Sequence, residues 1–384
     1  MHWLSDVVAY VLPFIVGLSV LVFVHELGHY LFARLNNVKV ETFSVGFGRE
    51  IWGMTDKHGT RWRVSWLPFG GYVMMAGDKD AASAPDVEKL ANMPREEFNK
   101  TLYSKSALQK ISVFGGGPLG NYIYGFFVIA AAFFFRGAPD NRVKVEDVVA
   151  RSPAAEAGIT RGDVIESVNG EKIETAQDLY NIIAKNNDKV LDIQVSRADA
   201  FLSVGVVPRE MFYEASDNSE TTKRKMIGVV FAPPEIVKVG LWEATKRSGR
   251  FCLKISGDIM RALARLVAGS DEVKNLGGPV RIAKLFGDAF KTGDVSKLII
   301  FSAMLSINLG FINLLPLPAL DGGSIIISLV ELITRRPLSK KLQEATTQFG
   351  FVLLMGFMLF VTCNDILHLG VFSKIKSVFA GFCQ

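Results

Sequence analysis

The sequence contains little cysteine and few charged residues for a chain of 384 residues. Its three cysteines, Cys252, Cys363 and Cys383, form no CxxC pair, which excludes a disulfide framework and a cysteine-ligated zinc site. Charged residues make up 21% of the chain, against about 25% in a typical soluble domain. The net charge is only +5 and dense clusters of lysine and arginine are missing, so the sequence predicts no nucleic-acid partner.

Hydrophobic residues, by contrast, make up 49% of the sequence, and many of them lie in four long stretches without a charged side chain. Each stretch reaches the length of about 20 residues that a helix needs to cross a bilayer. The first has no positively charged start and no cleavage site of a signal peptide, so we expect it to be retained. The sequence therefore predicts a multi-pass α-helical membrane protein with about four transmembrane helices, at residues 7–24, 111–135, 298–320 and 345–364.

Basic residues beside these stretches predict how the chain is oriented, because cytoplasmic loops are enriched in lysine and arginine. Residues 1–33 contain neither, whereas Arg34 and Lys39 follow the first stretch. Four basic residues precede the fourth stretch, and Asp365 follows it. We therefore expect residues 34–110 and 331–344 to be cytoplasmic and residues 136–297 to be extracytoplasmic.

The first apolar stretch runs directly into His25-Glu26-Leu27-Gly28-His29. Residues i and i+4 lie on one face of a helix, so the two imidazoles can bind one metal ion, with Glu26 beside them as a proton acceptor. Ionisable groups inside a membrane span are costly and are functional by default. The pattern predicts a catalytic zinc site, and the alternative is a chance cluster at the membrane interface.

A catalytic zinc ion usually has three protein ligands, so a third must come from elsewhere in the chain. The remaining histidines, His2, His58 and His368, lie at a terminus, in a polar loop and at the far end of the fourth stretch. Asp321 ends the third apolar stretch much as His25 ends the first, and the predicted topology brings both to a similar depth near the cytoplasmic face. We expect Asp321 to be the third ligand; the alternative is that it only caps the next helix.

Three segments carry a family resemblance. Residues 313–323 read Asn-Leu-Leu-Pro-Leu-Pro-Ala-Leu-Asp-Gly-Gly, which resembles the N-x-x-P-x-P-x-x-D-G-G motif of the site-2 protease family of intramembrane zinc metalloproteases. Residues 116–121 resemble the family's A-G-P-x-x-N element, and residues 69–73 match its F-G-G-Y-V segment. A single PDZ-like insertion between the second and third stretches is similar to the bacterial regulator-of-sigma-E protease branch.

The resemblance implies one zinc ion per chain, bound by His25, His29 and Asp321, with Glu26 as the general base. It makes Asn313 a candidate for stabilising the oxyanion; the alternative is that Asn313 caps a broken helix. It also implies an enzyme of the bacterial inner membrane that acts in regulated intramembrane proteolysis and the stress response. The implied substrates are single-span membrane proteins, such as an anti-sigma factor after first-site cleavage, or signal-peptide remnants.

The sequence departs from the family pattern at four positions. Ser324 stands where histidine often follows D-G-G, and Arg281 replaces a glycine in the segment that resembles G-P-x-G-I. Gly116 and Gly120 stand where alanines are usual. None of the four is a proposed ligand, so we expect an active enzyme.

The segments outside the apolar stretches predict three further parts. Residues 41–75 alternate as strands do, which predicts a membrane-associated β-hairpin that re-enters the bilayer near the zinc; an ordinary cytoplasmic hairpin is the alternative. Residues 152–170 resemble a bacterial PDZ domain, within a β-rich insertion that contacts a peptide or a substrate domain. Residues 236–266 predict an amphipathic helix on the membrane surface, or one packed on the insertion.

Together these predictions divide the chain into segments that alternate between membrane and water. Two other functions are open to such a chain: a metal-binding membrane transporter or sensor, and a noncatalytic membrane scaffold built on the PDZ-like part. The predicted segments are the first transmembrane helix (1–35), the hairpin region (36–110), the second helix (111–135), the PDZ-like domain (136–235), the surface helices (236–297), the third helix (298–330), and the fourth helix with the C-terminal tail (345–384).

Overall fold

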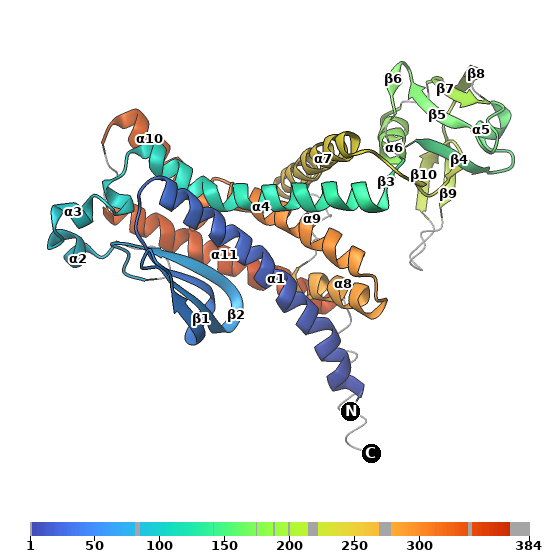
Figure 1. Cartoon of the computed structure of the whole chain (residues 1–384). Coiled ribbons are helices and arrows are strands. Elements are labelled where there is room, and N and C mark those ends of the chain that lie inside the picture. The colour runs from blue at the N-terminus through green and yellow to red at the C-terminus, as the bar shows by residue number, and fades with distance from the viewer. Residues whose placement is uncertain are drawn as a thin grey trace. The chain divides into compact units, whose positions relative to one another are not determined.

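The computed structural model describes residues 2–80, 85–140, 142–173, 175–186, 189–198, 200–213, 222–268, 278–336 and 340–368. The chain forms two compact units (Figure 1). Met1–Ala132 and Leu241–Gln384 make up the first, which we call the helical unit. Phe133–Gly240 make up the second, which we call the inserted unit because it interrupts the first.

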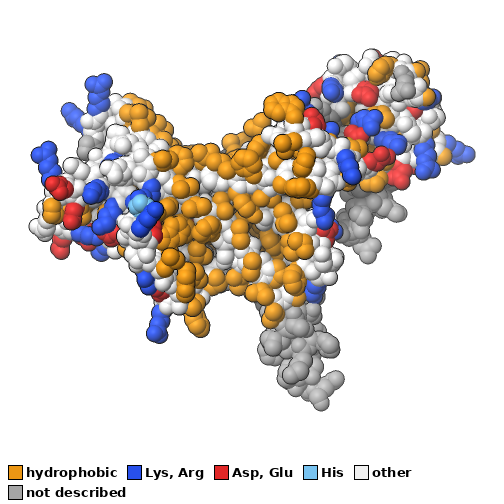
Figure 2. Space-filling model, in the orientation of Figure 1, with side chains coloured by type: hydrophobic (Ala, Val, Ile, Leu, Met, Phe, Trp, Pro, Cys, Tyr) orange, Lys and Arg blue, Asp and Glu red, His pale blue; other side chains and the backbone are white. Residues whose placement is uncertain are grey.

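Three of the described helices are long and apolar enough to cross a membrane: α1 (His2–Leu35), α4 (Ala107–Arg136) and α9 (Val295–Asn313). The fourth predicted span lies in α11 (Lys340–His368), whose apolar part, Gln348–Cys363, is shorter. Many large hydrophobic side chains on these helices are exposed, and Figure 2 shows them spread over the face of the helical unit. An apolar outer surface of this extent is suited to lipid.

The third predicted segment, 298–330, is not one continuous helix. Helix α9 ends at Asn313, and α10 (Asp321–Thr334) begins only after the connection 314–320. Pro316 and Pro318 lie in this connection, and proline supplies no backbone donor and clashes with the preceding turn of a helix. Asp321 is therefore the first residue of a new helix.

Helices α1 and α4 pack closely because glycine backbones meet where they cross. A Cβ atom at Gly28 would lie 2.1 Å from the carbonyl oxygen of Gly116, and one at Gly120 would lie 2.9 Å from that of Val24. Small residues permit such contacts between membrane helices. This packing explains why glycine suits positions 116 and 120, where the family pattern has alanine.

The strands β1 (Val40–Thr55) and β2 (Arg61–Met75) pair antiparallel, and each bends, so that together they give four segments. Phe43 pairs with both Val73 and Trp62, so the first half of β1 lies between the two halves of β2. The resulting order is 50–55, 61–65, 40–45 and 71–75, with the last as an edge segment that faces α1. Glycines with positive φ lie at the bends: Gly46, Gly48 and Gly70.

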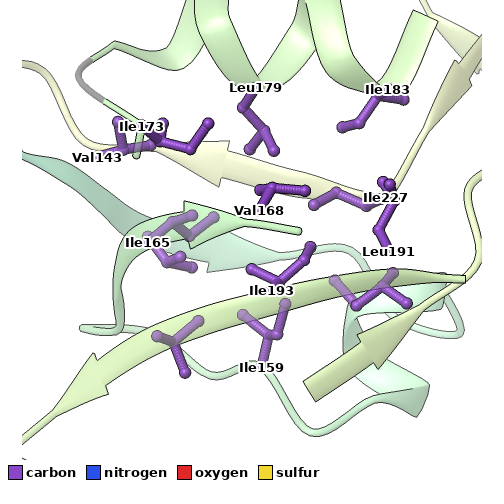
Figure 3. Close-up of a cluster of buried hydrophobic side chains, with 14 residues drawn as sticks. Val143, Ile159, Ile165, Val168, Ile173, Leu179, Ile183, Leu191, Ile193 and Ile227 are labelled. Carbon is purple, nitrogen blue, oxygen red and sulfur yellow. The ribbon is translucent and has the colours of Figure 1, made fainter. Parts of the chain in front are cut away.

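The inserted unit is a β-rich domain with two short helices. Its main sheet has the strand order β11-β4-β5-β7-β8, and β6 pairs with β5. Fourteen buried hydrophobic residues fill its core, with Leu179 and Ile183 of the helix facing Val168 and Ile193 of the sheet (Figure 3). The elements are β4 (Val143–Val148), α5 (Pro153–Glu156), β5 (Val164–Val168), β6 (Glu171–Lys172), α6 (Ala176–Lys185), β7 (Leu191–Arg197), β8 (Ala200–Val206) and β11 (Val229–Phe231).

Local signals explain the turns of this unit. Ser152 caps α5, since its side chain accepts a hydrogen bond from the backbone N–H of Ala155. Asn169 and Gly170 both have positive φ between β5 and β6, which a tight hairpin turn requires. Two further strand pairs complete the unit: β9 (Arg209–Tyr213) with β10 (Thr222–Met226), and β3 (Ala138–Pro139) with β12 (Ile236–Val237).

Helix α7 (Leu241–Val267) contacts the other helices of the helical unit. The hydroxyl group of Ser248 donates a hydrogen bond to the carbonyl oxygen of Phe126 in α4, and the hydroxyls of Tyr122 and Ser256 lie 2.8 Å apart. Its large side chains Trp242 and Leu253 remain exposed. The other elements of the helical unit are α2 (Val87–Ala91), α3 (Arg95–Phe98), the 3-10 helix η1 (Leu102–Ser104) and α8 (Pro279–Lys291).

Candidate metal centre

Helix α1 brings His25 and His29 to one face, one turn apart. Their Nε2 atoms lie 3.2 Å from each other, and both side chains are largely buried. This proximity follows from the i, i+4 spacing on a regular helix. The two ring nitrogens therefore point to one position, as the sequence predicts.

Asp321 completes the cluster from the start of α10. Its Oδ2 atom lies 3.2 Å from Nε2 of His25, and its Oδ1 atom lies 3.3 Å from Nε2 of His29. The N-cap position of α10 is occupied by Leu320, without a side-chain cap. Within the described ranges, these three residues are the one group of three metal-binding side chains, with ligand atoms all within 4.8 Å of one another.

The space beside these atoms fits a metal ion, because α4 presents a glycine to it. A Cβ atom at Gly117 would lie 2.4 Å from Nε2 of His29 and 2.8 Å from Nε2 of His25. Two imidazole nitrogens and one carboxylate form a ligand set typical of catalytic zinc, and they leave a coordination position free for water or substrate. The residues present thus suit zinc in number and kind.

The outer nitrogens of both rings have partners on α4. Nδ1 of His29 lies 2.9 Å from the carbonyl oxygen of Val113, and Nδ1 of His25 lies 3.1 Å from Nδ2 of the fully buried Asn121. The sequence alone predicts no role for either α4 residue. The one signal was the position of Asn121 in the segment that resembles A-G-P-x-x-N.

Glu26 follows His25 on α1 and faces the edge segment of β2. A Cβ atom at Gly71 would lie 3.3 Å from Cγ of Glu26, and the backbone N–H of Val73 is also close to the Glu26 carboxylate. The carboxylate thus lies between the cluster and the hairpin. A side chain in this place can exchange a proton with a group bound beside the cluster.

Asn313 is the last residue of α9 and is partly buried. In the described part of the chain, no hydrogen bond joins it to His25, His29 or Asp321. Its role in stabilising an oxyanion stays a prediction.

Comparison with known proteins identifies relatives over nearly the whole chain. Residues 13–357 match peptidase family M50. A protein of Agrobacterium fabrum named as a putative zinc metalloprotease is 35% identical over 370 residues, which are 93% of this chain and 95% of that protein. The metalloprotease MmpA of Caulobacter vibrioides is 33% identical over 385 residues, which are 94% of this chain and 96% of that protein.

Two solved structures match a smaller part of the chain. The PDZ domain of HtrA3, bound to a phage-derived ligand, is 26% identical with a TM-score of 0.17, and the match covers 18% of this chain and 61% of that one. The PDZ domain of an SdrC-like protein from Listeria monocytogenes is 22% identical with a TM-score of 0.19. This match covers 24% of this chain and 87% of that one.

Proposed function

Because this chain belongs to peptidase family M50 and is a membrane zinc metalloprotease, we propose that it cleaves peptide bonds within the transmembrane segments of single-span proteins. The observation that carries this proposal is the position of the ligands. His25 and His29 lie in a helix that is apolar enough to cross a membrane, and both are largely buried. Family membership also decides against a transporter, a sensor or a noncatalytic scaffold.

Each residue of the site has a distinct part in the proposed hydrolysis. His25, His29 and Asp321 hold the zinc ion, which when bound lowers the pKa of a coordinated water and polarises the substrate carbonyl. Glu26 takes the proton from the attacking water and passes it to the leaving amine. The apolar helices around the cluster limit the access of bulk water.

The edge segment 71–75 offers the unwound substrate a partner for its backbone. A transmembrane helix hides its peptide bonds, so cleavage requires local unwinding, and the freed N–H and C=O groups need new hydrogen bonds in the membrane. Addition of the substrate as a further strand meets this need. The contact of Glu26 with Gly71 and Val73 supports this location, because a strand added there lies close to the general base.

The apolar surface of the hairpin supports its insertion into the bilayer. Ile51, Trp52 and Trp66 are 64%, 59% and 71% exposed. Three large hydrophobic side chains exposed on one hairpin are better suited to lipid than to water. We therefore propose that the sheet formed by β1 and β2 re-enters the membrane beside α1.

The proposed location is the bacterial inner membrane. Arg34 and Lys39 favour a cytoplasmic end for α1, which brings the zinc site near the cytoplasmic face and the inserted unit to the other side. In this arrangement the PDZ-like inserted unit acts as a size filter or docking surface for substrates already trimmed outside the membrane. An anti-sigma factor or a signal-peptide remnant fits this description, in regulated intramembrane proteolysis.

The proposal is tested by mapping the scissile bond. Purified enzyme is incubated with a single-span substrate whose outer domain has been removed, and the products are identified by mass spectrometry. We expect one or a few cuts inside the apolar segment, and more product when a helix-breaking residue is placed near the cut. Cleavage confined to the polar flanks would show that the enzyme is a surface protease.

A further inference from the structure

The proton positions on the two zinc-binding imidazoles are set by what lies behind each ring. A neutral imidazole that binds metal through Nε2 carries its proton on Nδ1, and that N–H needs an acceptor in a buried site. For His29 the acceptor is the carbonyl oxygen of Val113, at 2.9 Å. A carbonyl oxygen can only accept, so the proton of His29 is fixed on Nδ1.

His25 has a different partner, the side-chain amide of Asn121. Nδ2 of this amide lies 3.1 Å from Nδ1 of His25, whereas Oδ1 of the same amide is buried and has no hydrogen-bond partner among the residues that the structure describes. A rotation of the amide by 180° exchanges the two atoms, gives Oδ1 a partner and supplies His25 with an acceptor. Buried polar atoms are rarely left unpaired, so this arrangement also removes the cost of a buried acceptor without a donor.

We propose that Asn121 is a positioning residue of the zinc site: its Oδ1 atom accepts the Nδ1 proton of His25 and so presents Nε2 to the metal. The inference goes beyond the ligand set, because Asn121 contacts His25 at Nδ1, on the side of the ring away from the metal position. It also concerns zinc binding and does not depend on which substrate the enzyme cuts.

Asn121 is held in place from two further sides. Its backbone carbonyl oxygen accepts a hydrogen bond of 3.0 Å from the hydroxyl group of Ser306 in α9. A Cβ atom at Gly310 would lie 3.2 Å from Cβ of Asn121, so α9 approaches the residue closely. The amide that orients His25 of α1 is therefore fixed where α4 meets α9.

Zinc affinity of the full chain in detergent tests the proposal, measured by competition with a chromophoric chelator. Asn121→Leu removes the acceptor at similar volume, and we expect affinity to fall about 10- to 100-fold. Asn121→Asp keeps an acceptor oxygen, and we expect it to bind zinc within about threefold of the wild type. Asn308→Leu is the matched control, since Oδ1 of Asn308 is also buried without a partner but no hydrogen bond links Asn308 to the described zinc ligands; its affinity should not change.

Two results would overturn the proposal: Asn121→Leu binding zinc as tightly as the wild type, or Asn121→Asp losing as much affinity as Asn121→Leu. The second result would mean that packing alone matters at this position. A measurement on the wild type avoids any folding defect. In zinc-loaded protein with nitrogen-15 histidine, magnetic resonance should show a proton on Nδ1 of His25, and an unprotonated Nδ1 would contradict the inference.

Discussion

The zinc site depends on a residue without a side chain as much as on its ligands. Gly117 of α4 lies against both imidazoles, and the position that its missing Cβ would occupy is within 3 Å of Nε2 of His25 and of His29. Sequence motifs draw attention to the ligands and the base. The space that the metal ion needs is provided by the neighbouring helix.

Replacing Gly117 with alanine should therefore block the metal position. We expect Gly117→Ala to lower zinc affinity by at least about tenfold and to reduce cleavage in parallel, because the methyl group lies 2.4 Å from Nε2 of His29. Gly115→Ala is the control, since a Cβ atom there meets no atom of the described residues within 4 Å. Zinc per chain, measured by elemental analysis after dialysis, decides between them; equal zinc content in both variants would contradict the account.

A partly buried ion pair stabilises the inserted unit. The Asp163 carboxylate is fully buried, and its oxygens accept hydrogen bonds of 2.7 Å from Nε and Nη2 of Arg197. The Arg197 guanidinium holds the pKa of Asp163 below its usual value. The unfolded chain therefore binds the proton more readily, so the stabilisation is complete above the unfolded pKa of about 4 and is lost as the pH falls below it.

Asp163→Asn should open the inserted unit even at neutral pH. We expect a loss of about 2 kcal/mol in local stability. The substitution removes the negative charge that pairs with Arg197, while the Arg197 guanidinium keeps partial access to water. Amide hydrogen exchange of residues 142–173 in the full chain measures this loss. Glu156→Gln, which removes an exposed pair with Arg209, should change exchange little. Similar exchange in Asp163→Asn and the wild type would contradict the role of the pair.

The connection 314–320 between α9 and α10 determines where the third ligand, Asp321, lies. It contains the two prolines that end α9, and it releases Asp321 at the start of α10. Helix α11 supports the connection through a close contact: a Cβ atom at Gly350 would lie 2.3 Å from the carbonyl oxygen of Pro318. The position of Asp321 therefore depends on a helix that supplies none of the three described ligands.

Gly350→Ala should displace α11 from this connection. Overpacking of this kind costs about 1–3 kcal/mol, so we expect a lower midpoint of thermal unfolding and weaker zinc binding through Asp321. Gly356 lies on the same helix, and a Cβ atom there meets no atom of the described residues within 4 Å. Gly356→Ala should therefore behave like the wild type. If both variants unfold and bind zinc alike, α11 does not support the ligand-bearing connection.

Across the whole molecule, the sequence predicted the type of reaction better than it predicted how distant segments pack. Short-range patterns were sufficient for the histidine pair on one helix face and for the apolar helices. The break after Asn313 could be foreseen from its prolines, but the length of the apolar run outweighed them. Contacts between distant segments could not be predicted in the same way. The family resemblance marked Asn121 but not its place behind His25, and no pattern indicated the four-segment sheet made from two bent strands.

If Glu26 is the general base beside the three zinc ligands, Glu26→Gln should abolish most of the hydrolysis without loss of zinc. The substitution keeps the size of the side chain and leaves His25, His29 and Asp321 intact. Wild type and variant are purified in detergent with one zinc ion per chain confirmed, and each is given the trimmed single-span substrate. We expect the variant to cleave about 10²- to 10⁴-fold more slowly, and a zinc chelator to stop the wild type. Equal rates in the two proteins, with zinc bound in both, would contradict the account.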